Sequence, residues 1–340
     1  MNVLDLVARL SLDSKDYDSG MKKAKGLAST IGGGIANAMK VGIAAVGAAT
    51  TAVGTFAMSS VGVGQNFDKS MSQVAATMGK TTEEIEDLRN FAQEMGRTTA
   101  FSATQAADAL NYMALAGYDA ETSMKMLPNV LNLAAAGNMD LARASDMVTD
   151  TQTAFGISLE RTSQMVDEMA KAASTGNTSV EQLGDAFLTV GGLAQELNGG
   201  MVILDDGTEV AVDGVQELEI ALTAMANAGI KGSEAGTHMR NVITKLSDPT
   251  DEGTQALEAM GVAIFDTEGQ MRSLADIFSD LNNEMYTMSQ EDRIKTITSL
   301  FNARDLTSAK ALLNAISEDW DKIGASIIDA EGAEIGRAHV

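Results

Sequence analysis

The chain has 340 residues, which is enough for two or three domains with sizeable cores. Its 47 acidic and 24 basic residues give a net charge of −23, which argues against binding nucleic acid through clustered Lys and Arg. It contains no cysteine, so disulfides, cysteine-ligated zinc and thiol catalysis are excluded. Abundant Met, Ala and Gly, with only two prolines, favour long stretches of helix.

The N-terminal part divides into two segments. Residues 1–30 are rich in charge after an apolar start, and they predict a short strand or helix that leads into an exposed helix. Residues 31–66 are rich in Ala and Gly, and no charged residue occurs from Val41 to Phe67. A stretch of this length can span a bilayer, although small residues make its transfer into lipid marginal. Two interpretations stay open for 41–67: a conditional membrane segment, or a buried or self-associating helix of a soluble oligomer.

Residues 67–330 show the signals of successive short helices. Three Ser or Thr residues are followed three positions later by Glu or Gln, a pattern that predicts capped helix starts. The three pairs are Thr81 with Glu84, Ser102 with Gln105, and Ser179 with Gln182. Apolar residues at helical spacing follow each pair.

Five glycines at intervals of about 20 residues predict helix ends, because glycine readily adopts the left-handed conformation there. They are Gly96, Gly117, Gly137, Gly156 and Gly176. Pro128 fits the first turn of a helix, so we expect it to divide 118–137 into two helices. Matched helix lengths with short turns are compatible with an array of helical hairpins or with a single irregular bundle.

Two short β-hairpins interrupt the helical pattern. Residues 201–212 contain two β-prone runs around Asp206-Gly207, which is a strong hairpin signal. A weaker hairpin is expected at 262–272, around 266–269. Further helices are expected at 216–230, 234–247, 252–260, 273–288, 291–302 and 304–330. The fold class predicted is therefore mainly α, a multi-helix bundle or an array of helical hairpins with one or two small β-hairpins.

No constellation of residues for catalysis, cofactor binding or metal binding is found in the sequence. His238 is the single histidine before the last few residues, and we expect it on a helix face. Phosphate-binding and dinucleotide-binding glycine motifs are absent, and Gly32, Gly33 and Gly34 are read as flexible. Asp205 and Asp206 are assigned to a hairpin turn, and Glu83 and Glu84 to a helix start. Asn177-Thr178-Ser179 is assigned to a helix cap.

Methionines recur at helical spacing in the central region. The sequence predicts that they form ordinary core, with adaptable binding faces as the alternative. They are Met113, Met124, Met126, Met139, Met147, Met165 and Met169.

The last six residues, 335–340, match a translation of the sequencing-adapter sequence ATC GGA AGA GCA CAC GTC. We interpret them as read-through into a sequencing adapter, with a real, frayed C-terminus as the alternative, and we expect the natural protein to continue beyond about Glu334.

Several blocks between residues 67 and 313 resemble the core region of phage tail tape-measure proteins, in the family's order. They are FDKSMSQVAATMG, FSATQAADALNYMALAGYDAETSMKMLPNVLNLAAAGNMDL, NTSVEQLGDAF, ANAGIKGSEAGTHMRNVITKLSDPT, GVAIFDTEGQMRSLADIF and FNARDLTSAKALL. An Ala/Gly-rich segment ahead of the core is also similar. The resemblance covers more than two-thirds of the chain, which is identified as an N-terminal fragment of such a protein.

The resemblance implies a structural protein of the tail lumen that sets tail length during assembly in the host cytoplasm. It implies expulsion during genome ejection, and not an enzyme, although some relatives carry a C-terminal hydrolase or peptidase module. The implied partners are further copies of the chain (a trimer is compatible), the tail tube protein and tail assembly chaperones, with no specific nucleic-acid binding. The alternative function is a membrane-inserting pore or translocation protein that uses 41–67 in the host membrane.

Overall fold

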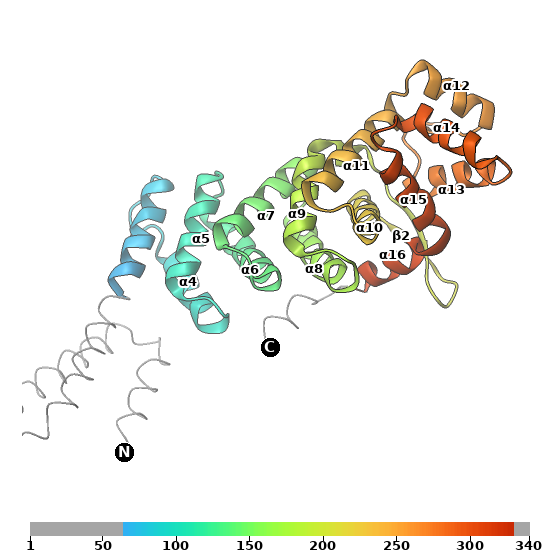
Figure 1. The fold of residues 1–340 in the computed structure, drawn as a ribbon. Coiled ribbons are helices and arrows are strands. Elements are labelled where there is room, and N and C mark those ends of the chain that lie inside the picture. The colour runs from blue at the N-terminus through green and yellow to red at the C-terminus, as the bar shows by residue number, and fades with distance from the viewer. Residues whose placement is uncertain (1–63, 330–340) are drawn as a thin grey trace, which may run out of the picture. The chain divides into compact units, whose positions relative to one another are not determined.

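The computed structural model of the protein describes residues 64–329 (Figure 1). The segments expected at 1–30 and 335–340 lie outside these residues, as does 31–66 except for its last three positions. Within 64–329 the regular structure is helical apart from one two-stranded antiparallel sheet, which confirms the mainly α prediction. The chain forms two compact units, one up to Met124 and one from Lys125 onward.

The first unit contains a helix over residues 64–77, then α4 (Glu86–Thr98), α5 (Ala103–Leu115) and the beginning of α6 (Ala120–Gly137). Helices α4 and α5 pack against each other. The core of this unit is built from apolar side chains on the inner faces of its helices. Among them are Phe67, Met71, Val74, Ile85, Leu88, Leu110 and Met113.

Helix α4 begins four residues later than its capping signal predicts. Glu84 Oε2 accepts a hydrogen bond from Thr81 N at 2.7 Å, and Thr81 Oγ1 accepts one from Glu84 N at 3.4 Å. Residues 82–85 nevertheless form a turn. Ile85, whose side chain is buried, has φ −115° and ψ 23°, which are not helical values, so the helix starts at Glu86. The predicted contacts are confirmed and the predicted start is wrong.

The other two capping boxes are confirmed. Ser102 and Gln105 exchange hydrogen bonds at the start of α5, and Ser179 and Gln182 do so at the start of α9. Each pair satisfies two backbone N–H groups that have no partner inside the helix.

Four of the five glycines lie at helix ends, in three different ways. Gly117 and Gly156 follow α5 and α7 with φ +90° and +64°, as predicted for left-handed positions. Gly137 is the last residue of α6, and Asn138 after it adopts the left-handed conformation with φ 48°. Gly176 ends α8 with extended backbone, at φ −96° and ψ 168°.

Gly96 lies inside α4, so its assignment to a helix end is wrong. A Cβ atom at this position would overlap the backbone of Ala103. The glycine therefore permits the start of α5 to approach α4 closely, a tertiary reason that local sequence patterns do not reveal.

Helix α6 continues through Pro128, so the predicted division of 118–137 is wrong. Proline lacks the N–H that would bond to the carbonyl of Met124, and it disfavours a helix interior. The residues around it are buried on the core side of the helix, and this packing outweighs the local preference. They include Met126, Leu127, Val130, Leu131, Leu133 and Ala134.

The second unit continues α6 and contains all the remaining elements. These are α7 (Leu141–Phe155), α8 (Leu159–Thr175), α9 (Val180–Val190), η3 (Gly191–Glu196), β1 (Gly200–Ile203), β2 (Glu209–Val212), α10 (Gly214–Asn227), α11 (Gly232–Ser247), α12 (Asp251–Met260), α13 (Leu274–Met285), α14 (Gln290–Phe301), α15 (Leu306–Glu318) and α16 (Trp320–Ile328).

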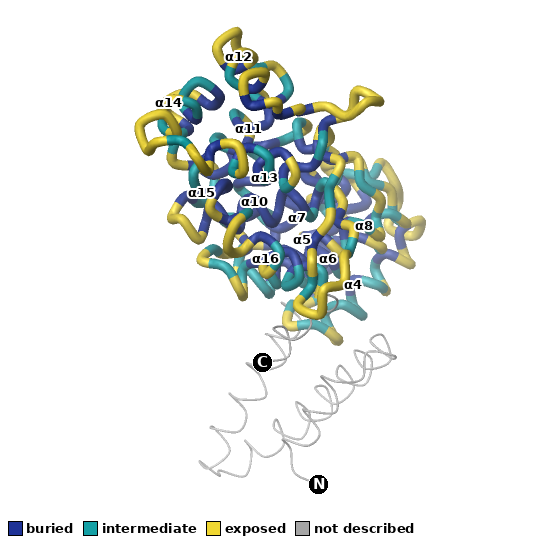
Figure 2. The backbone as a smooth tube through the Cα atoms, turned by 90° about the vertical axis from the view of Figure 1, so that its right-hand side faces the viewer, coloured by how far each residue is buried: buried dark blue, intermediate teal, exposed yellow. Residues whose placement is uncertain are grey.

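Helix α10 is the central element of the second unit. Every residue from Glu217 to Ala226 is buried, so this helix has no solvent face over almost three turns (Figure 2). The elements that pack against it are α8, α9, η3, α11, α15 and α16. The second unit is thus an irregular bundle around one buried helix, which confirms the bundle alternative for this unit.

The hairpin predicted at 201–212 is confirmed. Strands β1 and β2 pair antiparallel, with Gly200 opposite Val212 and Ile203 opposite Glu209. Leu204 N donates to Thr208 O at 2.8 Å, and Gly207 N donates to Leu204 O at 2.8 Å. Gly207 has φ +83°, so the connection is a tight turn closed by a left-handed glycine.

The weaker hairpin forms in a reduced version. It contains a single antiparallel bridge between Phe265 and Met271, and Asp266 N donates to Gln270 O at 2.8 Å. Gly269 has φ +81° and closes the turn in the same manner as Gly207 does.

The last expected helix, 304–330, is divided in two at Asp319, where φ is −132° and ψ is −10°. The break is tertiary in origin, because it lets α16 pack against α8, α10 and β1. Gly324 of α16 lies so close to β1 that an added Cβ atom would be 2.6 Å from Val202 Cγ2.

Candidate functional site

His238 lies on a helix face, as expected, but its polar contacts were not foreseen. Its Nδ1 atom on α11 is 2.6 Å from Oδ1 of Asp305, a fully buried carboxylate before α15. Asp305 also accepts hydrogen bonds from Asn241 Nδ2 at 3.1 Å and from Asn302 Nδ2 at 3.0 Å. Because its oxygens are occupied by these donors, this carboxylate ties α11 to the start of α15.

The acidic pair at 205–206 lies in the hairpin turn, as predicted, whereas the pair at 83–84 lies in the turn before α4 and not in the helix. Asp206 is in the hairpin turn, where hydrogen bonds from Thr208 lower the pKa of its carboxyl. Glu84 lies before α4, where hydrogen bonds from Thr81 lower the pKa of its carboxyl. Both carboxylates stabilise local backbone turns. Ser179 is the N-cap of α9, as expected for the end of the 177–179 motif.

Five of the seven methionines listed by spacing are buried, namely Met113, Met126, Met147, Met165 and Met169. Met124 and Met139 are half-buried. The positions of these side chains fit ordinary core.

Two general types of site are not present in the described part of the chain. Residues 64–329 contain no group of three or more His, Cys, Asp or Glu side chains placed to hold a metal ion. The same residues include no helix with the length and apolarity needed to cross a membrane. The apolar segment expected at 41–67 lies outside the described residues up to position 63, and residues 64–67 belong to the helix over 64–77.

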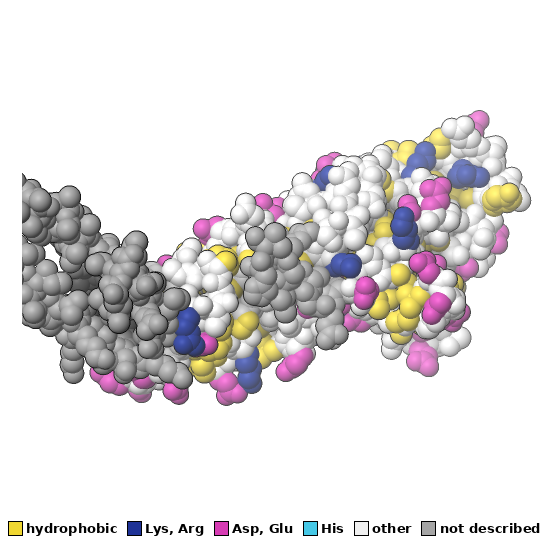
Figure 3. All heavy atoms as spheres, turned by 90° about the horizontal axis from the view of Figure 1, so that it is seen from below, with side chains coloured by type: hydrophobic (Ala, Val, Ile, Leu, Met, Phe, Trp, Pro, Cys, Tyr) yellow, Lys and Arg dark blue, Asp and Glu magenta, His cyan; other side chains and the backbone are white. Residues whose placement is uncertain are grey.

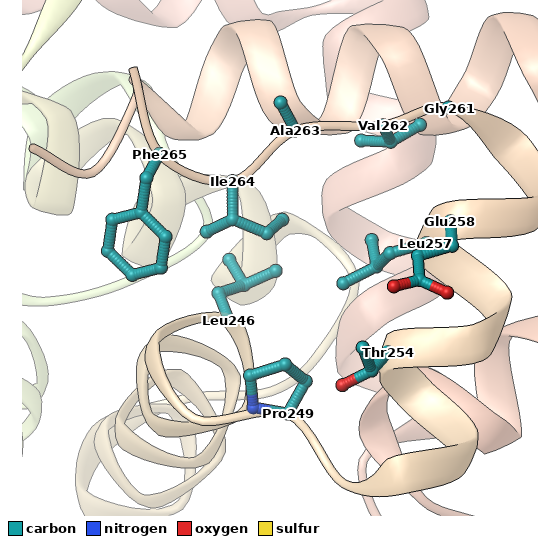
Figure 4. Close-up of a pocket in the computed structure, with 10 residues that line it drawn as sticks. All are labelled: Leu246, Pro249, Thr254, Leu257, Glu258, Gly261, Val262, Ala263, Ile264 and Phe265. Atoms are coloured by element: carbon teal, nitrogen blue, oxygen red, sulfur yellow. The ribbon is translucent and has the colours of Figure 1, made fainter. Parts of the chain in front are cut away.

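A shallow apolar pocket lies between the end of α11, helix α12 and residues 261–265, which lead into the weaker hairpin (Figure 4). Its volume is about 280 Å³, and Leu246, Pro249, Leu257 and Ile264 provide much of the lining. Glu258 is the single ionisable residue in the lining, so the pocket has no acid–base pair for chemistry. Another pocket, of about 340 Å³, lies in the first unit between residues 66–73 and α5 and has a polar lining.

A partly buried charged cluster joins α8 to the start of α10 and is the strongest candidate site in the second unit. Arg161, in the first turn of α8, donates from Nε to Asp213 Oδ2 at 2.6 Å and from Nη2 to Asp213 Oδ1 at 3.0 Å. Asp213 is the N-cap of α10, where it also accepts from Gln216 N at 2.9 Å. Burial raises the pKa of Asp213, but the hydrogen bonds from Arg161 outweigh this effect and leave the pKa below its usual value.

Glu168 shares the same guanidinium group two turns further along α8. Its Oε2 accepts from Arg161 Nη1 at 2.7 Å, and its Oε1 accepts from Gln216 Nε2 at 2.7 Å. Burial of Glu168 nevertheless raises the pKa of its carboxyl, because desolvation disfavours the charged form. One cation therefore serves two carboxylates in this cluster.

Glu219 of α10 is a third carboxyl whose pKa is affected by the charges of this cluster. No group in the described residues donates a hydrogen bond to it. The side chain is fully buried, and both carboxyl oxygens are without a hydrogen-bond partner within the described residues. Burial raises the pKa of Glu219 well above its usual value, and the nearby charge of Glu168 raises it further. The site therefore favours the neutral, protonated form of this side chain over the charged form.

Glu217 lies two residues earlier on α10 and contacts a different element. Its Oε1 accepts a hydrogen bond from Leu274 N at 2.7 Å, at the first residue of α13, while Oε2 is buried without a partner. Burial raises the pKa of Glu217 to about 7 despite hydrogen bonds from backbone N–H groups, which lower it. This carboxyl therefore titrates near neutral pH.

The cluster has no access to either pocket, because none of its residues lines them. A buried carboxyl that cannot reach a substrate can control the stability of the helices around it, but it cannot act on a bound molecule. Sequence reasoning missed this cluster. The available signal was the run ELEIALTAMA at 217–226, in which two glutamates occur in a helix with no polar stripe.

The surface of the described part mixes both signs of charge. On the face drawn in Figure 3, Lys and Arg side chains are scattered among Asp and Glu side chains and form no continuous basic stripe. Several ion pairs are at the surface, such as Lys295 Nζ with Glu291 Oε1 at 2.6 Å on α14.

Comparison with known proteins gives one family and two named relatives. A family model described as phage-related minor tail protein matches residues 89–202 and 209–302. The gap between the matched segments, 203–208, corresponds to the turn between β1 and β2, the part of a hairpin that most readily varies.

The chain is 28% identical over 340 residues to the tape measure protein of Pneumococcus phage Dp-1, covering 98% of this chain and 28% of that protein. It is 27% identical over 334 residues to the probable tape measure protein of Escherichia phage P2, covering 96% of this chain and 37% of that protein. The chain thus spans well under half the length of these relatives. No solved structure matches it.

Proposed function

The chain belongs to the phage-related minor tail protein family, and we propose that it acts in the tail as a tape measure. In this role it lies in the tail lumen, contributes to setting tail length during assembly and is expelled during genome ejection. The observation that carries the proposal is similarity over nearly the whole chain to two proteins that bear the tape measure name.

The architecture supports a structural role that includes a change of shape. The described α-helices have between 9 and 18 residues, so none is longer than about 27 Å at 1.5 Å per residue. A chain of 340 residues drawn out as a single helix would reach about 510 Å. A tape measure built from such short helices gains length only when its compact units open, so we propose that they open in the tail tube.

The proposed partners follow from this location. They are further copies of the chain, a trimer being compatible, the tail tube protein around it and tail assembly chaperones in the host cytoplasm. We propose no specific contact with nucleic acid, since the net charge of −23 repels phosphate. We also propose no catalytic, cofactor or metal role for the described residues.

The arrangement of parts proposed for the chain is a charged segment (1–30), an Ala/Gly-rich apolar helix (31–66) and a helical core (67–330). The core carries the hairpin at 201–212, and 335–340 stays assigned to an artefact. The family model matches residues 89–202 and 209–302, which lie within this proposed core.

The length function is tested by an in-frame deletion of residues 64–329 from the gene in the phage that encodes it. We expect shorter tails or none, as counted and measured by negative-stain electron microscopy, with a synonymously recoded gene as the matched control. Normal numbers of tails with unchanged length would contradict the proposal.

The state of the chain inside the tail is tested by thiol labelling, because the chain has no cysteine of its own. Tyr286→Cys introduces a thiol at a site that is 83% exposed, and Phe278→Cys introduces one that is buried in the compact form. Mass spectrometry of the two peptides reports labelling in purified tails. We expect both positions to react with maleimide in tails, whereas only position 286 reacts in the free protein. Protection of position 278 in tails would show that the second unit stays compact.

A further inference from the structure

The central helix of the second unit has two buried carboxyl groups. Glu219 is completely inaccessible to solvent, and Glu217 is 1% exposed. Each has at least one carboxyl oxygen that is buried without a hydrogen-bond partner in the described part of the chain. Burying an ionised carboxylate without compensating hydrogen bonds costs several kcal/mol, so such groups hold a proton or weaken the fold.

The positive charge nearest to Glu219, that of Arg161, is already paired with two other carboxylates. Arg161 donates to Asp213 through Nε and Nη2 and to Glu168 through Nη1. Its guanidinium group therefore makes no hydrogen bond to Glu219, and ionisation of Glu219 would place a third negative charge near a single cation. Coulomb repulsion in a buried site is weakly screened, which makes the third charge especially unfavourable.

The charged groups around the two glutamates come from three places. Glu168 and Arg161 of α8 and the N-cap residue Asp213 act on Glu219, while Asp276 of α13 acts on Glu217. The other elements that pack on α10 add one more buried charged side chain among the described residues, Asp305 before α15. That carboxylate is bonded to His238, Asn241 and Asn302.

We propose that α10 is a proton-dependent lock: its packing against α13 and α8 requires Glu217 and Glu219 to be protonated, and loss of these protons loosens the second unit. The lock is a property of the folded chain. We further propose that the second unit begins to unfold at α10 when the chain extends in the tail tube. This use of the lock rests on the proposed function.

The direction of the pH effect follows from the titration of these groups. Burial raises the pKa of Glu217 from 4.5 to about 7, and it raises the pKa of Glu219 well above 4.5. A raised pKa in the folded state means that the contribution to stability is fully present below pH 4.5 and is lost as the pH rises through about 7. The second unit is therefore less stable at alkaline pH than at acidic pH.

The test is thermal unfolding of the full chain between pH 5 and pH 8.5 at constant ionic strength, for the wild type and for Glu219→Gln. We expect the midpoint of the wild type to fall by roughly 5–10 °C between pH 5 and pH 8. The variant should unfold at a higher temperature than the wild type at pH 8 and show a shallower slope. Glu284→Gln, at an exposed position on α13, is the matched control and should follow the wild type.

Hydrogen exchange locates the effect. After correction for the intrinsic exchange rate, the amides of α10 should lose protection between pH 6 and pH 8, whereas those of α12 should not. A wild-type midpoint that is constant or rises from pH 5 to pH 8 would overturn the lock, as would equal loss of protection in both helices.

A measurement on the wild type alone covers the case in which Glu219→Gln does not fold. Infrared difference spectra on unlabelled and ¹³C-glutamate protein should show a buried, protonated carboxyl band at pH 6 that weakens as the pH rises through about 7, where Glu217 loses its proton. Absence of this band at pH 6 contradicts the lock. None of these results depends on tail length, so the lock and the tape measure function fail separately.

Discussion

Two helix contacts in the second unit differ in the kind of side chain that forms them. Helices α9 and α11 meet through small residues, and a Cβ atom added to Gly236 would be 2.5 Å from the carbonyl oxygen of Ala186. Helices α8 and α10 meet at partly buried charged groups centred on Arg161. The first contact depends on shape, which pH does not change, whereas the second depends on ionisation. The same bundle thus combines a helix contact that does not depend on pH with one that a change of pH can weaken.

The sharpest way to break the charged contact is Arg161→Ala. The substitution leaves the buried Glu168 without its cation while Glu219 stays buried nearby, and removal of one partner of a buried pair costs about 3–5 kcal/mol. We expect a loss of this size in the free energy of unfolding, measured by urea denaturation at pH 7.

Lys295→Ala is the control for that experiment, because its ion pair with Glu291 is exposed. It should leave the denaturation midpoint almost unchanged. Equal effects of the two substitutions would mean that burial of the Arg161–Glu168 pair is not what makes it important.

The second prediction uses pH to separate the two kinds of contact. A pKa of about 7 for Glu217, against 4.5 in the unfolded chain, corresponds to about 3 kcal/mol of stability lost between pH 4.5 and neutral to alkaline pH. Glu217→Gln removes this titration and keeps an oxygen that can accept from Leu274 N. We expect the variant to be more stable than the wild type at pH 8, by up to that amount, and no more stable at pH 5. A gain that is the same at both pH values would refute the assignment.

The signals for helix starts and for the hairpin that could be read from the sequence are all local. The pairs Ser102–Gln105 and Ser179–Gln182 act within one turn of helix, and Asp206-Gly207 acts within one β-turn, so neighbouring residues were sufficient to predict them. Where prediction failed, a distant contact decided the outcome. Gly96 accommodates Ala103 of the next helix, and buried packing keeps α6 helical through Pro128.

The charged cluster could not have been predicted from spacing. Arg161 and Asp213 are 52 residues apart, and Glu217 and Leu274 are 57 apart, with no motif that links them. In a chain with 47 acidic residues, a glutamate inside a helix is normally solvated. The informative feature was the lack of a polar stripe around Glu217 and Glu219, which predicts a buried helix and hence buried carboxyls.

The third prediction breaks the contact that depends on shape. Gly236→Val places a branched side chain against the Ala186 carbonyl and Thr189, and overpacking of this kind costs about 1–3 kcal/mol. We expect the loss to be equal at pH 5 and pH 8, in contrast to the change at Glu217. Arg240→Val puts the same side chain on the exposed face of α11 and controls for the helix propensity of valine. If the cost at position 236 varied strongly with pH, the separation of the two contacts would be false.

The smallest expected effect compares the two units through a feature that both contain. Ser179→Ala removes the hydroxyl that accepts from Gln182 N at 3.2 Å, and loss of such a cap costs about 1 kcal/mol. Ser102→Ala removes the equivalent acceptor from α5 in the first unit, where the hydroxyl accepts from Gln105 N at 3.2 Å. Hydrogen exchange should show faster exchange at the start of α9 for the first variant and at the start of α5 for the second. Because α9 packs against α10, we expect Ser179→Ala to speed exchange in α10 as well, and more at pH 8 than at pH 6. Ser102→Ala should leave α10 unchanged, and an equal effect of both variants on α10 would show that the two units unfold together.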